Sequence, residues 1–596
     1  MTNRMNLEFL PNELIFNLFE YLSILDLFQA FYGLNSRLNT LILAHCRKCR
    51  LDFESITKTN FDIICKNYLP YIIDRIISLR LSDDDNTPQQ IDLFLSYNFH
   101  LQQFINLQII SLSNIHSSYI LDKLISECSQ LISLTHFTLI KCYISINRSN
   151  ANRLYSKIWS LSKLNYCYLD ISFTHASYFP MSTVISTSLK HLSIINISCY
   201  LNELIHLFQS TPNLQYLSIE FMDYANEFEL PLHILSITHL KLSFDSSLDI
   251  LQYLLQNLPD LYNLTLETCN IYMDGYQWEE MIRKYLTKLR KFRFKMRFSA
   301  LNDENKEIQS DQILNSFRTK FWIDEHQWFV RCHWYSSDEQ NRFDFIDLFT
   351  LPYAFKDFLS YTGCTLAKST CPNDDEYWSY NHVNNLCYGS SHFTSSIMSR
   401  VRFSNIQYLS LSLPFNDKFL LVVSKLDRLT SLCISINNHK KTNNVLSQLQ
   451  IILDRAPCLY SLSLGPWSSF NLQIPLMENT SKSIRRLNFQ GYAWGKNWCY
   501  FDNEQCRQLS CSSLGVQCET LLIKVKNRRN VLDLVNSMSN LRALNVRCED
   551  DHWTNQKDTL SQTKDELIEW LQDNLPSSSM ITRDTHQIHT VRLWIR

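Results

Sequence analysis

Residues 239–267 read HLKLSFDSSLDILQYLLQNLPDLYNLTLE, and this stretch contains the unit from which most of the chain is built. HLKLS and NLTLE each alternate apolar and polar residues, which is the pattern of a β-strand with one buried face. Between them, LDILQYLLQNL (248–258) places apolar residues at helical spacing. The stretch therefore predicts a strand, a helix and a second strand, joined by short turns.

The same apolar-x-apolar pair recurs sixteen times, at spacings of 23 to 34 residues within each series except for one final gap of 47. The first series comprises Leu79/Leu81, Ile110/Leu112, Phe137/Leu139, Cys167/Leu169, Leu192/Ile194, Leu217/Ile219, Leu240/Leu242, Leu264/Leu266 and Phe292/Phe294. The second comprises Leu409/Leu411, Leu432/Ile434, Leu462/Leu464, Leu487/Phe489, Leu521/Ile523, Leu544/Val546 and Val591/Leu593. We expect the final gap to contain one degenerate unit.

A strand and a helix of this length cannot form a domain alone, so their repetition predicts stacking into a solenoid. The pattern resembles the leucine-rich repeat over roughly residues 75–300 and 405–596. The resemblance implies an α/β fold with parallel strands on a concave face and helices on a convex face. Residues 301–400 fit the pattern poorly and are rich in aromatic residues, so we expect divergent repeats or an ordered insertion there.

The composition excludes several classes of protein. Lys and Arg number 56 against 58 Asp and Glu, for a net charge of −2, which argues against a globally basic nucleic-acid binder. Only 8 glycines occur in 596 residues, too few for collagen or glycine-rich linkers. The start, MTNRMNLEFLPNELI, lacks the apolar core of a signal peptide, and no uninterrupted apolar span is long enough for a membrane. We therefore expect a cytoplasmic or nuclear chain with reduced cysteines.

Three short helices are predicted before the repeats. Pro11 suits the first turn of a helix, and Leu14, Leu18 and Leu22 recur at four-residue spacing along it. A second helix is expected near residue 26 and a third near residue 35. A segment of this size does not normally stabilise itself, so its apolar stripes require either the repeats or a partner protein to cover them.

This segment resembles the F-box. The matching residues are Leu10-Pro11-x-Glu13-Leu14, Phe19-x-Tyr21-Leu22, Asp26-Leu27 and Leu34-Asn35-Ser36-Arg37. The resemblance implies docking on the adaptor subunit that links F-box proteins to a cullin in SCF-type ubiquitin ligases. It places these residues at the adaptor interface: Leu10, Pro11, Leu14, Leu18, Leu22 and Leu27. The alternative is a helical cap that only closes the first repeat.

One stretch is strongly basic: RKYLTKLRKFRFKMRF, residues 283–298. A strand here would bury the aromatic residues and expose Lys291, Arg293 and Lys295, which could hold a carboxylate or a phosphate. The alternative is a solvated face balanced by nearby acids. In leucine-rich repeats the residues beside the buried pair face the hollow side, where Tyr and Arg favour a protein ligand. The candidate client-binding residues are Tyr166, Tyr168, His191, Tyr216, His239, Lys241, Lys291, Arg293 and Lys295.

No catalytic, cofactor or metal site is predicted. The catalytic and nucleotide-binding motifs HExxH, GxSxG, GxGxxG and GxxxxGK[ST] do not occur, and GYAWGK (491–496) is one residue short of a phosphate-binding loop. Cys46 and Cys49 form a CxxC without a second ligand pair, so two thiols at a helix end are expected. Cys364, Cys371, His382, Cys387 and His392 cluster with irregular spacing, which is a weak metal signal.

The sequence thus predicts four regions: an F-box (1–50), a first series of repeats (51–300), divergent repeats or an insertion (301–400) and a second series (401–596). The predicted function is a non-enzymatic substrate receptor of an SCF-type ubiquitin ligase, without a cofactor. Its partners would be the SCF adaptor, through it a cullin, and a protein client that is acidic or phosphorylated, but neither nucleic acid nor membrane. The alternative is a leucine-rich-repeat scaffold or inhibitor unconnected with ubiquitination.

Overall fold

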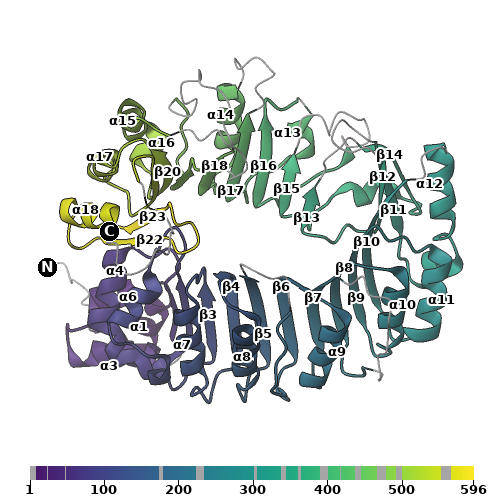
Figure 1. The fold of residues 1–596 in the computed structure, drawn as a ribbon, viewed down its shortest axis with the longest axis horizontal. Coiled ribbons are helices and arrows are strands. Elements are labelled where there is room, and N and C mark those ends of the chain that lie inside the picture. The colour runs from purple at the N-terminus through teal and green to yellow at the C-terminus, as the bar shows by residue number, and fades with distance from the viewer. Residues whose placement is uncertain are drawn as a thin grey trace. The chain divides into compact units, whose positions relative to one another are not determined.

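The computed structural model describes residues 9–22, 24–46, 49–173, 179–222, 234–300, 305–336, 344–359, 364–388, 400–416, 418–436, 445–465, 478–491, 500–551, 553 and 565–596. The chain divides into two compact units. The first comprises residues 1–196, 209–213 and 594–596, and the second comprises 197–208 and 214–593. Both units are α/β, with strands and helices alternating along the chain (Figure 1).

In the first unit, strands β1 to β6 lie in the sheet in chain order and pair in parallel. They are β1 (Cys49–Asp52), β2 (Ile76–Ser82), β3 (Ile109–Ser113), β4 (His136–Ile144), β5 (Tyr166–Phe173) and β6 (His191–Cys199), with the unit boundary inside β6. The register sets the first apolar residues of successive pairs opposite one another: Leu79 faces Ile110, and Ile110 faces Phe137. These predicted parallel strands are confirmed, and β1 adds one before them.

The helices of the first unit begin where polar residues can cap them. Ser117 accepts a hydrogen bond from the Ile120 N–H and Asn147 from the Asn150 N–H, satisfying donors that the first helical turn leaves unpaired. Buried apolar residues then recur at helical spacing, as at Leu121 and Leu124. The helices after β1 are α4 (Lys58–Ile63), α5 (Leu69–Ile72), α6 (Gln90–Ser96), α7 (Ser118–Cys128) and α8 (Arg148–Trp159).

In the second unit, β7 (Tyr216–Met222), β8 (His239–Asp245), β9 (Asn263–Cys269) and β10 (Lys291–Ser299) continue the parallel pattern. The adjoining helices are α9 (Leu201–Ser210), α10 (Leu248–Gln256), α11 (Gly275–Tyr285) and α12 (Lys306–Asn315). The pattern changes after β10, because β12 (Phe345–Thr350), β11 (Val330–Tyr335) and β14 (Cys364–Ser369) join the sheet antiparallel, in that order. Part of region 301–400 therefore departs from the strand–helix repeat.

A ten-stranded sheet forms the rest of the second unit, in the order β13-β15-β16-β17-β18-β19-β20-β21-β23-β22. Its strands are β13 (Asp357–Leu359), β15 (Asn385–Tyr388), β16 (Tyr408–Leu413), β17 (Ser431–Ile436), β18 (Ser461–Leu464), β19 (Arg486–Asn488), β20 (Thr520–Val525), β21 (Ala543–Cys548), β22 (Met580–Arg583) and β23 (Val591–Trp594). Its helices are α13 (Phe419–Val422), α14 (Val445–Arg455), α15 (Asn503–Cys511), α16 (Ser513–Val516), α17 (Arg529–Ser537) and α18 (Glu566–Asn574).

The final gap contains a helix and a strand, as expected of one degenerate unit, but the strand does not continue the stack. Of the described residues, this gap supplies α18 and β22, and β22 lies outside β23 at the edge of the sheet. Strand β23 therefore follows β21 directly, so no further strand is stacked between them. Spacing along the chain does not reveal the position of a strand in the sheet, so it could not distinguish an edge strand from a stacked one.

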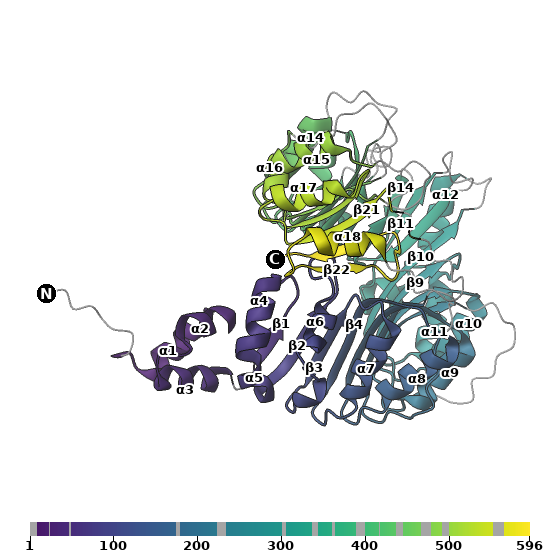
Figure 2. The ribbon, with the colours of Figure 1, turned by 60° about the vertical axis from the view of Figure 1, so that its left-hand side comes forward.

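Three helices precede the first sheet, as predicted: α1 (Asn12–Phe19), α2 (Ile24–Phe31) and α3 (Ser36–His45), which lie together near α4 and α5 (Figure 2). Throughout the described residues, we find no helix with the length and hydropathy of a membrane span.

Candidate protein-interaction surfaces

Helix α1 has one wide apolar stripe, and only one edge of it is covered. Ile15 and Phe19 are buried, with 1% and 0% of their surface exposed. Leu14 lies at the other edge of the stripe and is 50% exposed. Leu18 and Leu22 are half-buried. The four-residue leucine spacing read from the sequence thus follows the open edge of the helix, not its packed face.

The packed face is held by specific contacts. Phe19 meets Phe31 of α2 with ring centroids 5.5 Å apart. Arg37 of α3 donates hydrogen bonds to the Asn12 side chain and to the Leu10 carbonyl oxygen, both at 2.7 Å. Asn35 caps α3 by accepting from the Leu38 N–H at 2.8 Å. These contacts fix the start of α1 on α3, so the exposed side of α1 is presented by an ordered segment.

The three helices are also anchored to the repeats. Phe28 of α2 is buried and lies 4.7 Å, centroid to centroid, from Tyr68 in the segment after α4. Arg75, which precedes β2, donates a hydrogen bond to the Leu43 carbonyl oxygen of α3. The first repeats therefore cover one side of the helical segment, and a partner protein is not needed there.

Among the side chains of this short segment that the structure describes, four large apolar ones nevertheless remain in solvent. They are Phe9 (86% exposed), Leu14 (50%), Tyr21 (89%) and Leu34 (64%), and we call them the helical patch. Pro11 is exposed and Leu10 is half-buried. Leu27 is 1% exposed and lies in the interior of the segment, so it cannot contact a partner while the helices stay packed. The six residues assigned to the adaptor interface thus differ widely in accessibility.

The second candidate surface is the polar face of β7 to β10. Strand register sets its side chains in rows: Tyr216 lies opposite His239, His239 opposite Asn263, and Asn263 opposite Lys291. In the next row Lys241 lies opposite Thr265, which lies opposite Arg293. Lys241, Lys291 and Arg293 are all exposed, and we call them the cationic face. Among the described residues, no hydrogen bond or ion pair engages these three side chains.

Lys295 differs from the other two basic residues of β10. Its Nζ lies 2.6 Å from a Glu267 carboxylate oxygen of the neighbouring strand, and its side chain is only 13% exposed. Nearby basic groups are likewise paired: Lys288 with Asp260 at 2.6 Å, and Arg297 with Asp347 at 2.6 Å. Of the three β10 residues predicted to bind an anion, Lys291 and Arg293 thus have no ion-pair partner in the described part of the chain, and neither has Lys241 of β8.

Strand β10 is rigidly supported. Phe292, Phe294 and Met296 are buried, as the alternating pattern predicted. Trp278 of α11 packs against both rings, at centroid distances of 4.7 Å from Phe292 and 6.2 Å from Phe294. Strand β10 also pairs on both sides, with β9 and β12. The buried rings fix which side of β10 faces solvent, and they therefore orient Lys291 and Arg293.

Aromatic and histidine side chains occupy the equivalent row elsewhere. In the first unit Tyr166 stacks between His136 and His191, at centroid distances of 5.3 Å and 4.5 Å. Tyr168 lies half-buried in the next row, and burial raises its pKa. In the second unit Tyr216 and His239 lie farther apart, at 6.4 Å. His136, Tyr166 and His191 therefore form one stacked row that stands partly in solvent, whereas the rings of Tyr216 and His239 are tilted by 31°.

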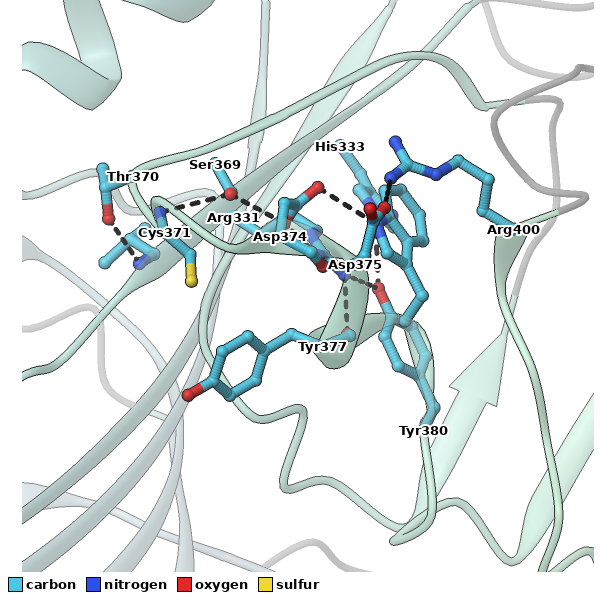
Figure 3. A network of polar contacts seen from close by, with 12 residues as sticks. Arg331, His333, Ser369, Thr370, Cys371, Asp374, Asp375, Tyr377, Tyr380 and Arg400 are labelled. Atoms are coloured by element: carbon cyan, nitrogen blue, oxygen red, sulfur yellow. Dashed lines mark hydrogen bonds and ion pairs between the residues drawn. The ribbon is translucent and has the colours of Figure 1, made fainter.

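Arg331 of β11 lies at the centre of a buried polar network (Figure 3). Its guanidinium, 0% exposed, pairs with Asp374 and donates to the Tyr377 carbonyl oxygen at 2.9 Å and to the Tyr380 hydroxyl at 3.2 Å. It also stacks over the Trp378 ring at 3.9 Å. Burial alone would raise the pKa of Asp374, but the hydrogen bond and charge of Arg331 lower it. The Arg331 side chain is enclosed by its hydrogen-bond and ion-pair partners, which fits a structural role and not a binding site.

His333 is the titratable group of this network. Burial, together with the neighbouring Arg331 charge, holds its pKa well below the usual value, so it is neutral at physiological pH. Its Nε2 lies 3.5 Å from the Tyr380 hydroxyl. A fully enclosed neutral imidazole has no access to a substrate, so His333 is better explained by packing than by acid–base chemistry.

The cysteines provide no metal site among the residues that the structure describes. Cys46 caps the end of α3 and Cys49 begins β1, and both are buried free thiols. The hydrogen bond between them lowers the pKa of Cys46 and raises that of Cys49. Cys364 and Cys371 are buried free thiols as well. His392 and residues 492–496 of the GYAWGK stretch lie outside the described residues.

Two residues of the β7–β10 face were missed by sequence reasoning: Glu267, which neutralises Lys295, and Glu220, which occupies the same row. Aligning the repeats on their buried pairs would have found both, because it sets Glu220, Glu267 and Lys295 at one position. No protein-family model matches the chain, and no curated protein matches it.

Proposed function

We propose that the chain is the substrate-recognition subunit of an SCF-type E3 ubiquitin ligase. In this proposal α1 to α3 form an F-box that docks on the ligase adaptor, and the strand–helix units are leucine-rich repeats that hold a protein client. The chain itself performs no chemistry. It raises the concentration of client lysines near the ubiquitin-loaded enzyme, which belongs to other subunits.

The observation that carries the proposal is the helical patch. Large apolar side chains that stay in solvent on a folded segment mark a protein contact, particularly when the same segment has already buried a core of its own. Tyr21 and Phe9 are 89% and 86% exposed while Phe19 of the same segment is fully buried. Covering such side chains releases roughly 25 cal/mol for each Å² of apolar surface removed from water.

Leu14, Leu18 and Leu22 belong to the proposed adaptor interface, together with Leu10 and Pro11. Leu18 and Leu22 are half-buried, so they would line the edge of the interface while Leu14 inserts. Leu27 would contribute indirectly, because its burial fixes how α2 packs within the segment.

The test is capture of the SCF adaptor by the purified full chain. Leu14→Asp should abolish capture, since a carboxylate would be buried against the adaptor's apolar surface. Ile132→Asp is the matched control, because Ile132 is 72% exposed outside the three helices. Equal capture by the wild-type chain and L14D would contradict the docking surface. Failure of the intact chain to bind the adaptor would favour a repeat scaffold or inhibitor unconnected with ubiquitination.

A further inference from the structure

The cationic face differs from an ordinary charged surface in the way its charges are distributed. Lys241, Lys291 and Arg293 come from two strands separated by β9, and register places Lys241 and Arg293 in one row, with Thr265 between them. Strands lie about 4.8 Å apart and alternate residues about 6.6 Å apart, so the backbone positions of the three cations lie within about 12 Å of one another. Thr265, which lies between Lys241 and Arg293 in that row, has a small side chain.

One row further along the strands the charge changes sign. Glu220 and Glu267 both lie in this row, with Ser243 between them, and the Glu267 carboxylate is 46% exposed. Asp245 follows at the end of β8. Lys295 lies in the same row and is paired with Glu267, so this row carries one net negative charge, about 7 Å beyond the row of Lys241 and Arg293.

This arrangement selects among anions. A polyanion such as single-stranded nucleic acid would extend its phosphates across the row of Glu220, Glu267 and Lys295, whose net negative charge repels them. A single carboxylate would leave two of the three cations without a counter-charge. A phosphorylated side chain carries between −1.5 and −2 charges, roughly, and three acceptor oxygens, which suits one guanidinium and two ammonium groups.

We propose that the cationic face binds a phosphorylated serine or threonine of a protein client, with Arg293, Lys291 and Lys241 contacting the phosphate. In the bound client, the residues that follow the phosphorylated one and extend toward the Glu220–Glu267 row are neutral or basic. The inference rests on the proposed function only in calling the phosphoprotein a client. Lys295 stays paired with Glu267 and takes no part in phosphate binding.

The experiment uses the full-length chain and a peptide library with a fixed central phosphoserine and randomised flanks, alongside the same library with serine. Phosphoserine should bind at least about tenfold more tightly than serine, equivalent to 1.4 kcal/mol. The triple variant K241S/K291S/R293S should lose that preference. Equal binding of the two libraries, or an unchanged preference in the triple variant, would overturn the proposal.

The matched control is R283S/K284S/K288S, which removes the same number of charges from α11 and the turn that follows it. This control variant should keep the phosphoserine preference. Loss of the preference in the control variant would show that only the total charge matters and would overturn the proposal. Single variants K291S and R293S are measured too, so that the outcome does not depend on folding of the triple variant. A thymidine oligonucleotide that binds more tightly than the phosphopeptides, through the same three residues, would favour a nucleic-acid surface instead.

Adaptor capture is measured on the same variants. Retained capture with no phosphoserine preference would refute only this inference. A phosphoserine preference without capture would refute only the proposed ligase role.

Discussion

The helical patch and the cationic face both stand in solvent, but for different physical reasons. Phe9, Leu14 and Tyr21 are apolar, so their exposure costs free energy until another protein covers them. Lys291 and Arg293 are charged and well hydrated, so they are stable without a partner. The comparison teaches that one surface suits a partner bound persistently, whereas the other suits a ligand whose charge can be added or removed.

Phe19→Ala should have the largest effect on this comparison. Truncating a fully buried phenylalanine costs about 3–5 kcal/mol through lost packing and a residual cavity. Hydrogen exchange of residues 12–45 should rise sharply and adaptor capture should disappear, while the phosphoserine preference persists. The control is Ile132→Ala, at 72% exposure outside the three helices, which should cost under about 0.5 kcal/mol of folding stability and leave adaptor capture unchanged. If F19A weakened both activities equally, the two surfaces would not be independent.

Tyr21→Ala should weaken adaptor binding without unfolding the helices. An aromatic side chain at the centre of an interface contributes about 2 kcal/mol, roughly thirtyfold in Kd. Because Tyr21 is 89% exposed, hydrogen exchange of α1 should stay as in the wild type. Calorimetry with purified adaptor gives the Kd, and Tyr119→Ala, at 75% exposure on α7, is the control. A Kd for Y21A within twofold of the wild type would remove Tyr21 from the interface.

Salt should separate the two surfaces without any substitution. The Debye length falls from about 10 Å at 0.1 M salt to about 3 Å at 1 M, which screens exposed charges but not apolar contacts. We expect phosphopeptide affinity to fall by about tenfold between these salt concentrations and adaptor affinity to change by less than about twofold. Titrations of one protein preparation with each ligand at both salt concentrations measure these two changes in affinity. A parallel loss of both affinities would mean that adaptor docking is electrostatic too.

Glu267→Gln should produce the smallest effect, and it should strengthen phosphopeptide binding where the other changes weaken binding. The substitution frees Lys295 from its ion pair at 2.6 Å and removes a negative charge beside the cationic face. Phosphopeptide affinity should rise by about two- to threefold, the size expected when a partly exposed charge is removed. Glu279→Gln, on α11, is the control and should change nothing. Weaker binding by E267Q would mean that Glu267 positions the ligand.

Much of the strand pattern follows directly from the sequence. Leu240 and Leu264 were predicted to begin equivalent strands, and register places them opposite each other. The burial of Phe292 and Phe294 was predicted as well. These features depend on local alternation, which a single repeat already contains. The three amino-terminal helices were located for the same reason.

Other features depend on contacts between residues distant in the chain. Whether Leu14 or Ile15 faces inward is decided by where α3 and the first repeats lie, and an apolar stripe alone does not reveal it. The antiparallel strands β11 and β12 carry no repeat signature, because their pairing is set by neighbours up to about fifty residues away, as with Arg297 and Asp347. The pairing of Lys295 likewise required the register of β9 against β10.

Most parallel strands in both units pair with the strands just before and just after them in the chain, as β8 does with β7 and β9. In such an arrangement each strand–helix repeat depends energetically on the neighbouring repeats and hardly at all on distant ones. A row of outward residues can then mutate while the buried pairs beneath it stay fixed. Evolution could thus change what such a surface binds one row at a time, keeping the rest of the molecule as inherited.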